Sequence, residues 1–304
     1  MRVLAATKDM SREEWLSLRK KGIGGSDAPT IMGVNPYGSI FDVWVDKCDP
    51  EFQIDDNENM YWGRILEDVL AKEFMIRNDK RLRNRYAILQ HDVHDFMLAN
   101  VDRLVVGEDA GWEGKTTNAF YKDEGTPKNM YVVQCQHCMA VTGKKKWYLS
   151  VLAGGQKYYQ YEVTRDDDFI ENQLIPREIE FWRMVQEGEM PAFDGSDTCT
   201  NLIMEKYPEL KAESIELSSE AVDRIEQYRS LTEQEKKIKE LKDALANQLK
   251  DNLQGYSKGY VQDYNVYWSE VMSKRFDQKR FEEEHPELYQ QYLKESSYRR
   301  FQVK

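Results

Sequence analysis

The sequence predicts an α/β protein with a C-terminal appendage built around one long helix. Apolar residues recur at helical spacing through residues 60–76, whereas residues 97–106 are mostly apolar and end in a Gly/Asp-rich turn typical of strand connections. Apolar residues also recur at steps of three, four and seven through residues 218–253, which predicts the long helix. The 304 residues suit one large domain with such an appendage.

The N-terminal part predicts short helices joined by a glycine-rich segment. Ser11 and Glu14 form a capping box, so a helix begins there and ends at Gly22. In the following segment, residues 22–33, Ser26 and Asp27 are expected to cap the next helix, whose free amides would bind an anion. An ordinary glycine-rich turn between helices is the alternative. Ser39 is predicted to begin a further helix.

The amphipathic helix at residues 60–76 carries an acid at an ambiguous position. Glu67 lies between the apolar positions rather than opposite them. It is either a solvated flank of the helix or an acid directed at a site beneath it.

The stretch from residue 97 to residue 117 carries the charges of greatest interest. We expect one strand over residues 97–106 with Asp102 in its middle, a turn at residues 107–111, and a second strand that carries Glu113 and Lys115. Acids are costly to bury unpaired in a sheet, and a divalent cation removes that cost. Mg²⁺ prefers such hard oxygen ligands. A surface hairpin with solvated acids is the alternative.

The next elements bring further polar groups close to this stretch. A helix is expected at residues 130–142, where Tyr131 and Gln134 share a face, and Gly143 ends it. The basic run Lys144, Lys145 and Lys146 is either a solvated strand end or a phosphate contact. A hairpin at residues 147–163 and a long helix, begun by the acids at residues 166–168 and kinked at Pro176, complete this part.

The polar linker at residues 191–198 is the predicted domain boundary. It separates a core domain, residues 1–195, from a C-terminal helical region, residues 196–304. That region is predicted to hold the long helix at about 218–253 and a small α/β tail. The tail comprises a strand at residues 260–272 and a helical segment at residues 275–293, broken at the His285-Pro286 step.

Composition limits the classes of function. A formal net charge of −11 argues against a generally basic nucleic-acid-binding surface but leaves room for a local basic channel. No apolar run approaches the length of a membrane span, so we expect a soluble, cytoplasmic protein without a membrane partner. The four cysteines are too few for a disulfide framework. Cys135 and Cys138 are expected to be buried helix residues rather than metal ligands, and His137 is expected to be a helix-face side chain near DNA or the core rather than a ligand.

Taken together, these motifs resemble the YqaJ-like viral recombinase family, the group that includes lambda exonuclease, and more widely the RecB-like, restriction-endonuclease-type nucleases. The resemblance runs from Trp15 to about Trp182, and each motif alone is weak. Their shared order and spacing carry it. The matching residues are Trp15 and Arg19; Gly22 to Asp27; Trp62, Gly63 and Glu67; Asp102; Glu113 to Thr116; Tyr131 and Gln134; and Ala140 to Gly143.

The resemblance implies a restriction-endonuclease-like (RecB-type) core, with a central mixed β-sheet flanked by helices on both faces. It implies a 5′-to-3′ exonuclease on linear double-stranded DNA that leaves 3′ single-stranded overhangs for phage-type recombination. Residues 1–195 would be the exonuclease domain. Two Mg²⁺ ions are expected as cofactors, and Mn²⁺ is expected to substitute.

Roles for individual residues follow from the same resemblance. Asp102, Glu113 and the main-chain carbonyl of Gly114 match the metal ligands, and Glu67 matches a helix acid near the second metal. The remaining matches are the catalytic lysine, Lys115; the site-organising pair, Tyr131 and Gln134; and the residues that hold the 5′-phosphate, Arg19 and Ser26. Relatives usually carry an apolar residue between the glutamate and the lysine, where this chain has Gly114. A glycine at this position makes the strand more flexible.

The resemblance also implies partners: the ends of double-stranded DNA, a single-strand annealing protein, and further copies of the chain in a ring, for which a trimer is one option. We expect the protein to be encoded by a phage or prophage and to act in the cytoplasm of the bacterial host cell. Three other functions stay open, namely a restriction-type or structure-specific endonuclease, a non-catalytic DNA-binding module, and a scaffold that recruits a partner through the long helix.

Overall fold

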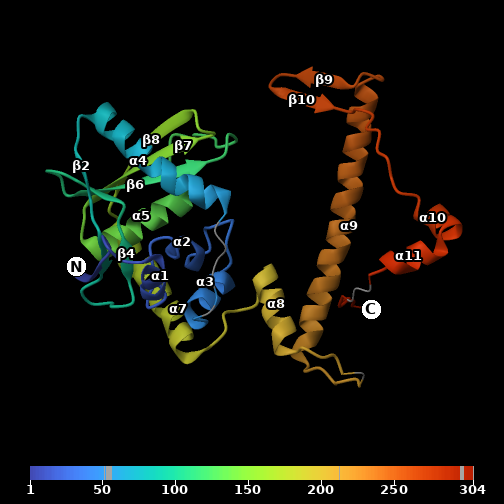
Figure 1. Cartoon of the computed structure of the whole chain (residues 1–304), viewed down its shortest axis with the longest axis horizontal. Helices are drawn as coiled ribbons and strands as arrows, with labels where there is room; N and C mark the ends of the chain where they lie inside the picture. Colours follow the sequence, from blue (N-terminus) through green and yellow to red (C-terminus); the bar gives the residue numbers. More distant parts are fainter. Residues whose placement is uncertain (51, 53–56, 212, 295–297, 304) are drawn as a thin grey trace. The chain divides into compact units, whose positions relative to one another are not determined.

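The chain divides into two structural units just after the end of helix α8 (Asp197–Lys206). The computed structural model describes residues 1–50, 52, 57–211, 213–294 and 298–303. Its units are Met1–Leu210 and Lys211–Lys304 (Figure 1). The first unit extends past the linker at residues 191–198 because helix α8 (Asp197–Lys206) packs on it. Cys199 of α8 is buried, and the Thr198 hydroxyl donates a hydrogen bond to Asp42.

The first unit is organised around a five-stranded mixed sheet. Its strand order is β2-β5-β6-β7-β8. The neighbours β6 and β7 run parallel, and the other neighbouring strands run antiparallel. The strands are β2 (Leu82–Asn84), β5 (Arg103–Val105), β6 (Ala110–Thr117), β7 (Lys146–Ala153) and β8 (Lys157–Thr164). This confirms the predicted α/β core with a central mixed sheet.

A smaller antiparallel sheet changes one sequence prediction. It consists of β1 (Arg2–Ala6), β3 (Ala87–Gln90) and β4 (Leu98–Asn100), in the order β1-β3-β4. The prediction of a single strand over residues 97–106 is therefore wrong. Because β4 pairs with β3 while β5 pairs with β6 and β2, the chain passes from one sheet to the other at residues 101 and 102. Asp102 lies at this junction rather than in mid-strand.

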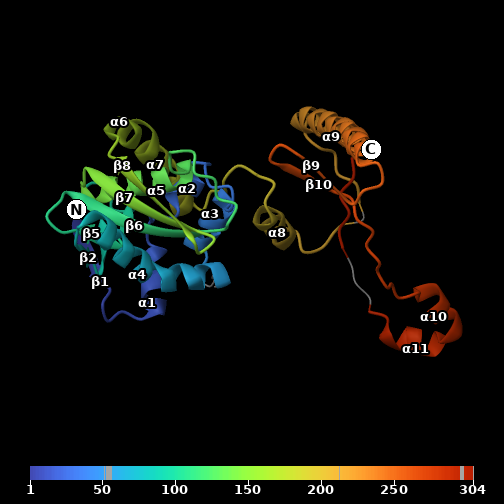
Figure 2. The same ribbon diagram turned by 90° about the horizontal axis from the view of Figure 1, so that it is seen from above.

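Helices cover both faces of the mixed sheet (Figure 2). Helix α4 packs on β6 and β7 from one side, and helix α5 packs on β7 and β8 from the other. The capping boxes at Ser11 and Ser39 begin α1 and α3 as predicted. The helices of this unit, besides α8, are α1 (Arg12–Arg19), α2 (Ala28–Ile31), α3 (Ile40–Cys48), α4 (Glu58–Asn78), α5 (Asn129–Thr142), α6 (Asp167–Phe169) and α7 (Ile175–Glu187).

The predicted irregularity near Pro176 takes the form of a π-helical turn. Asp166 caps α6, and the π-turn (Ile170–Leu174) then connects α6 to α7. Proline has no amide hydrogen to donate, so the hydrogen-bond pattern changes in the turn that precedes it. Pro176 itself lies in the first turn of α7.

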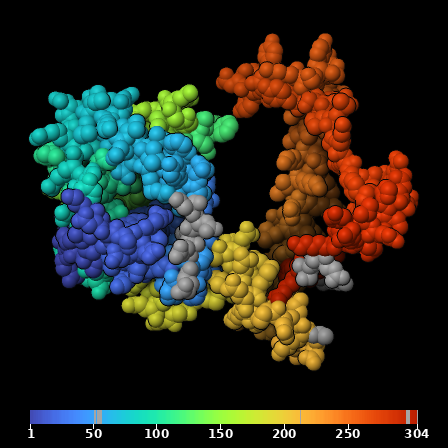
Figure 3. Space-filling model, in the orientation of Figure 1, coloured from blue at the N-terminus to red at the C-terminus, as the bar shows by residue number. Residues whose placement is uncertain are grey.

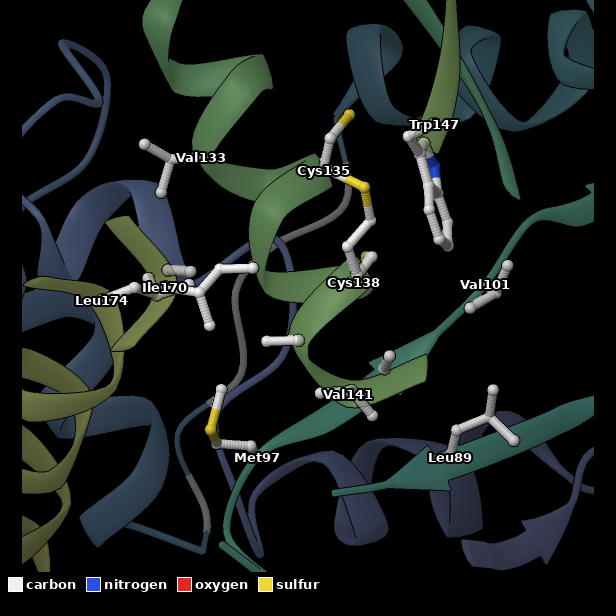
Figure 4. Close-up of a cluster of buried hydrophobic side chains, with 14 of the residues drawn as sticks. Leu89, Met97, Val101, Val133, Cys135, Cys138, Val141, Trp147, Ile170 and Leu174 are labelled. Atoms are coloured by element: carbon white, nitrogen blue, oxygen red, sulfur yellow. The ribbon is translucent and has the colours of Figure 1, made fainter. Parts of the chain in front are cut away.

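The core lies mainly between α5 and the two sheets. Cys135 and Cys138 of α5 belong to this apolar cluster, with Trp147 close to Cys135 (Figure 4). Their thiols are buried, and burial raises the pKa of each well above its ordinary value. Both cysteines are therefore core residues, as the sequence indicated.

A fully buried ionic pair links α5 to α7. His137 Nδ1 lies 2.7 Å from Glu178 Oε1, and His137 Nε2 lies 2.9 Å from the Leu98 carbonyl oxygen. Burial alone would lower the pKa of His137, but the charge and hydrogen bond of Glu178 outweigh it and raise the pKa. Since a carbonyl oxygen only accepts, Nε2 donates to Leu98, and the raised pKa favours a second proton on Nδ1, which faces Glu178 Oε1. His137 is thus a buried side chain on the core face of α5, one of the two surroundings expected for it from the sequence.

The tight packing of β6 against α4 accounts for Gly114. The Trp112 ring packs on Phe74 of α4, and its Nε1 donates to Ser150 Oγ at 3.0 Å. A Cβ added at Gly114 would lie 2.7 Å from Trp112 Cη2, which is closer than carbon atoms approach. The absent side chain therefore leaves room for the tryptophan ring.

The second unit is built on helix α9 (Glu220–Asn252), which confirms the predicted long helix. Its apolar stripe, including Leu231, Ile238 and Leu241, is exposed, and Figure 3 shows α9 side chains at the surface. The predicted single strand at residues 260–272 is wrong, because a hairpin forms there instead. The remaining elements are β9 (Lys258–Val261), β10 (Tyr264–Tyr267), α10 (Gln278–Glu284) and α11 (Pro286–Tyr292). No helix in the described part of the chain combines the length and apolarity needed to cross a membrane.

Replacing Glu178 with alanine should destabilise the protein by about 3 kcal/mol, because it leaves a buried imidazolium unpaired. The control is Glu180→Ala on the same helix, whose exposed pair with Arg177 should contribute less than about 1 kcal/mol. Urea unfolding followed by tryptophan fluorescence measures the free energy of unfolding of both variants.

The stabilisation by the His137–Glu178 pair should depend on pH. Because folding raises the pKa of His137, the stabilisation is complete below the ordinary value of 6.5 and is lost as pH rises through the pKa of the folded state. The Glu178→Ala effect should therefore shrink at alkaline pH, and an effect that grows there would contradict the pairing.

Replacing Gly114 with alanine should destabilise the protein by about 1–3 kcal/mol, because the Trp112 ring must move to admit the new methyl group. Gly195→Ala is the matched control, since open space surrounds that position. Thermal unfolding monitored by circular dichroism compares the two variants. Equal stability of both would show that the ring adjusts without cost.

Candidate functional site

A cavity of about 130 Å³ opens where the two sheets of the first unit meet α5. It gathers five of the residues singled out from the sequence: Arg19, Ser26, Asp102, Glu113 and Gln134. Its other lining residues are Trp15, Gly24, Gly25, Ile88, Leu98, Asn100 and Cys138. These positions are far apart in the sequence, so the tertiary fold creates the cavity.

Glu113 is the buried centre of the polar network. Its Oε1 lies 2.7 Å from Lys115 Nζ and accepts a 2.7 Å hydrogen bond from Gln134 Nε2. Residues two apart on a strand share a face, so Glu113 and Lys115 point together toward α5. Trp112 and Gly114 take the alternate positions on the α4 side.

Asp102 approaches the same point from the junction between the two sheets. Its Oδ2 accepts a hydrogen bond of 3.3 Å from the Gly114 amide, which ties β6 to the junction. Burial and the negative charges of Glu113 and Glu67 raise the pKa of Asp102 well above its ordinary value of 3.8. Two acids are thus held close together with little water to screen their repulsion.

Lys115 supplies a positive charge next to these acids. Burial alone would lower the pKa of Lys115, but the charges of Glu113 and Asp102 outweigh it and raise the pKa above its ordinary value. Lys115 is therefore an ammonium in the free protein. Such a group can orient a phosphate or water oxygen but has no lone pair with which to accept a proton.

Glu67 reaches the acidic cluster from the α4 side of the sheet. Its Oε1 lies 3.1 Å from Arg103 Nη2, and the same nitrogen also contacts Asp68. Burial raises the pKa of Glu67, Arg103 lowers it, and Glu113 adds repulsion, with a raised pKa as the net result. Glu67 is therefore electrostatically coupled to Glu113, although it does not line the cavity.

The chemistry of Asp102 and Glu113 fits a hard divalent cation. Both carboxylates line one cavity and repel each other, and a cation between them would remove that repulsion. No group of three or more His, Cys, Asp or Glu side chains in the described part of the chain is arranged to hold a metal ion. Mg²⁺ commonly takes one or two carboxylates and completes its octahedron with water and phosphate oxygens, so two are sufficient.

Arg19 and Ser26 meet at the mouth of the cavity. Arg19 Nη2 donates to Ser26 Oγ at 3.2 Å and to Asp27 Oδ1 at 3.4 Å, and its guanidinium lies over the Trp15 ring. The loop between them is anchored because Ile23 exchanges backbone hydrogen bonds with Phe96 and Leu98. A Cβ at Gly25 would lie 2.9 Å from Cys138 Sγ, so the loop packs closely on α5.

A buried ion pair beneath this loop supports Arg19. Asp27 Oδ2 lies 2.8 Å from Lys47 Nζ and also accepts from the Gly24 amide at 2.9 Å. Burial alone would raise the pKa of Asp27, but Lys47 and Arg19 lower it to about 2. Asp27 is thus a fixed anion that holds both cations.

The expected anion site at the start of the next helix is not formed. Helix α2 has only four residues. The Asp27 side chain accepts a hydrogen bond from the Gly24 amide and does not cap the helix. The amides of Asp27 and Ala28 both donate to the Gly24 carbonyl oxygen, so they are occupied. Only the Arg19 and Ser26 side chains of the predicted phosphate pocket converge as expected.

Like Glu67, the predicted site residues Lys115 and Gly114 do not line the cavity, and neither do four others. Tyr131 is buried in a neighbouring cluster with Tyr121 and Leu149, where burial raises the pKa of its hydroxyl. Lys144, Lys145 and Lys146 lie where β7 begins, beside the first residue of β6, whereas Lys115 lies five residues further along that strand. Lys144 pairs with Asp109 and Lys146 with Glu162.

Sequence reasoning did not identify three charged or aromatic residues that build the site. Trp15 lines the cavity under Arg19, Lys47 pairs with Asp27, and Arg103 pairs with Glu67. Trp15 belonged to a recognised motif but was given no role. No sequence signal distinguishes Lys47 or Arg103 from exposed cations, because their partners lie 20 and 36 residues away in the chain.

The sequence of this chain is similar to those of known proteins. Residues 14–145 match the YqaJ-like viral recombinase domain. The protein YqaJ of Bacillus subtilis (strain 168) is 40% identical over 311 residues, which covers 99% of this chain and 97% of that protein.

Among solved structures, an alkaline exonuclease (LHK-Exo) from Laribacter hongkongensis is 17% identical, with a TM-score of 0.48 over 64% of this chain and 98% of that one. A phage-related exonuclease from Haemophilus somnus 129PT is 14% identical, with a TM-score of 0.44 over 63% of this chain and 99% of that one. The domain match and the full-length relative together show that this chain belongs to the YqaJ-like viral recombinase family.

Proposed function

We propose that the protein is a metal-dependent exonuclease that degrades linear double-stranded DNA in phage-type recombination. The observation that carries the proposal is the shared cavity, in which two repelling carboxylates, Asp102 and Glu113, lie beside the phosphate-binding candidates Arg19 and Ser26. Membership of a viral recombinase family and the similarity to exonuclease structures support the same class of substrate.

The acids define where hydrolysis would take place. Asp102, Glu113 and the Gly114 carbonyl would hold one Mg²⁺ or Mn²⁺ ion, and Glu67 would lie near a second. When bound, the ions supply Lewis-acid activation of water and stabilise charge on the scissile phosphate. Gln134 fixes the Glu113 carboxylate through its 2.7 Å hydrogen bond. Tyr131 would organise this face of the site.

Lys115 would act as a fixed positive charge in this mechanism. Since its pKa is raised, the ammonium orients the attacking water or a phosphate oxygen rather than taking a proton from the water. The salt bridge to Glu113 keeps the amine within reach of the metal ligands. Lys144, Lys145 and Lys146 would contact the DNA backbone further along the sheet.

Arg19 and Ser26 would bind a terminal 5′-phosphate rather than the scissile one. Asp27 holds the Arg19 guanidinium beside the Ser26 hydroxyl, so two donors converge on one position. Each cut leaves a new 5′-phosphate that can enter this position, which favours degradation in the 5′-to-3′ direction. The product would be a 3′ overhang for a single-strand annealing protein in the bacterial cytoplasm, and a ring of identical chains would retain the DNA.

Linear duplex DNA should be lost in the presence of Mg²⁺ or Mn²⁺ and persist in excess chelator. Asp102→Ala, Glu113→Ala and Lys115→Ala should each lower the rate by about a hundredfold or more, because each removes charge at the reacting phosphate. Digestion of duplex labelled at either end measures rate and polarity together. Gly195→Ala in the linker serves as the control. Cleavage of covalently closed plasmid would identify an endonuclease instead, and full activity in chelator would exclude metal catalysis.

Duplex with a 5′-phosphate should be degraded faster than duplex with a 5′-hydroxyl. Arg19→Ala should remove most of that preference by deleting a charge-assisted hydrogen bond, without changing metal binding. Arg12→Ala, at the exposed start of the same helix, is the matched control and should retain the preference. Initial rates on the two substrates give the ratio for each variant. A ratio near one for the unmodified protein would remove the phosphate pocket from the mechanism.

A further inference from the structure

We propose that Arg103 is a positioning residue that holds the Glu67 carboxylate against the proposed metal site. The inference rests on the proposed function for its catalytic consequence, but it makes a separate claim about how the chain binds metal. Its basis is a buried guanidinium that reaches from the sheet to two adjacent acids on α4.

Arg103 is tied to the catalytic strands on one side. It follows Asp102 directly in the chain and lies opposite Trp112, the residue before Glu113, in the β5–β6 register. Its guanidinium carbon lies 5.6 Å from the centroid of the Trp112 ring, a cation–π distance. The tryptophan ring is itself fixed by Ser150 and Phe74. The position of the Arg103 side chain is therefore determined by the strand that carries the metal ligands.

On its other side Arg103 is tied to helix α4. Its Nη2 lies 3.1 Å from Glu67 Oε1 and also donates to Asp68 Oδ1. Glu67 and Asp68 are consecutive residues of one helix, so a single cation between them offsets their mutual repulsion. With Arg103 in place, Glu67 keeps one rotamer although its side chain is one-third exposed. The same contact fixes α4 relative to the strands that carry Asp102 and Glu113.

Burial excludes a direct DNA contact for Arg103. The residue is 8% exposed and lies on the α4 side of the sheet, whereas Arg19 and Ser26 line the cavity mouth. Its Nε is buried without a hydrogen-bond partner in the described structure. Burying a cation in this way is costly unless its partners hold it, which indicates that the ion pair to Glu67 and Asp68 keeps it in place. Arg103 can act on the reaction only through the acids it orients.

A double-mutant cycle between Arg103 and Glu67 tests this role. Arg103→Met and Glu67→Gln should each lower kcat by about 10- to 100-fold, the usual loss when a partner of a metal ligand is removed. KM for DNA should stay unchanged in both. If Arg103 acts through Glu67, the double variant should be no slower than Glu67→Gln alone. Losses that multiply, or a change confined to KM, would overturn the inference.

Mn²⁺ binding by the DNA-free protein supplies a readout that does not need catalysis. Electron paramagnetic resonance of free Mn²⁺ should show weaker binding by about tenfold in Arg103→Met and in Glu67→Gln, again without additivity. Unchanged Mn²⁺ affinity in Arg103→Met would overturn the inference even if the wild-type protein hydrolyses DNA. Absence of metal-dependent hydrolysis in the wild type would defeat the proposed function alone, since the Mn²⁺ titration still decides the role of Arg103.

Arg77→Met is the matched control for both measurements. Arg77 lies on α4, pairs with Glu73 and stacks on Tyr158, so it repeats the ion pair and the ring contact away from the cavity. It should leave kcat and Mn²⁺ affinity unchanged. If Arg103→Met does not fold, Arg103→Lys takes its place in the cycle, because it keeps the charge but loses the planar fork. Arg103→Lys should lower kcat and Mn²⁺ affinity by less than Arg103→Met, and its effect should likewise not add to that of Glu67→Gln.

Discussion

The repulsion between Asp102 and Glu113 is the interaction on which the site depends. Burial, together with the negative charge of Glu113, raises the pKa of Asp102 well above its ordinary value. Folding must offset that cost, and it does so through Lys115, Gln134 and the Gly114 amide. A cation bound between the two carboxylates would relieve the repulsion that remains. The proposed metal site would therefore be prepared by the fold before any ligand arrives.

The two faces of the mixed sheet have different tasks. The α5 face carries the Glu113 network, together with a core that includes Cys135 and Cys138. On the α4 face, Arg103 pairs with Glu67, and its guanidinium lies over the Trp112 ring. Because β6 alternates between the faces, a single strand connects both layers. Because Gly114 has no side chain, the Trp112 ring has room to pack beside it and beneath Arg103.

Buried ion pairs recur throughout the first unit, and each joins elements distant in sequence. His137 with Glu178 links α5 to α7, Asp27 with Lys47 links the glycine-rich loop to α3, and Arg103 with Glu67 links β5 to α4. Such pairs add little net stability compared with apolar packing, but an incorrect arrangement would leave a charge unpaired. We infer that they select one arrangement of the elements around the cavity.

The sequence by itself determined most of the helices and the residue types of the candidate site. Capping boxes marked α1 and α3, the spacing of apolar residues marked α4 and α9, and Glu113 with Lys115 followed from alternation on one strand. Tertiary structure decided what depends on long-range pairing. Residues 97–106 contribute to two different sheets. The backbone amides at the start of α2 donate to the Gly24 carbonyl oxygen, and the side chains of Arg103 and Lys47 are buried. Local propensity carries no information on these points, because each is set by a partner distant in the chain.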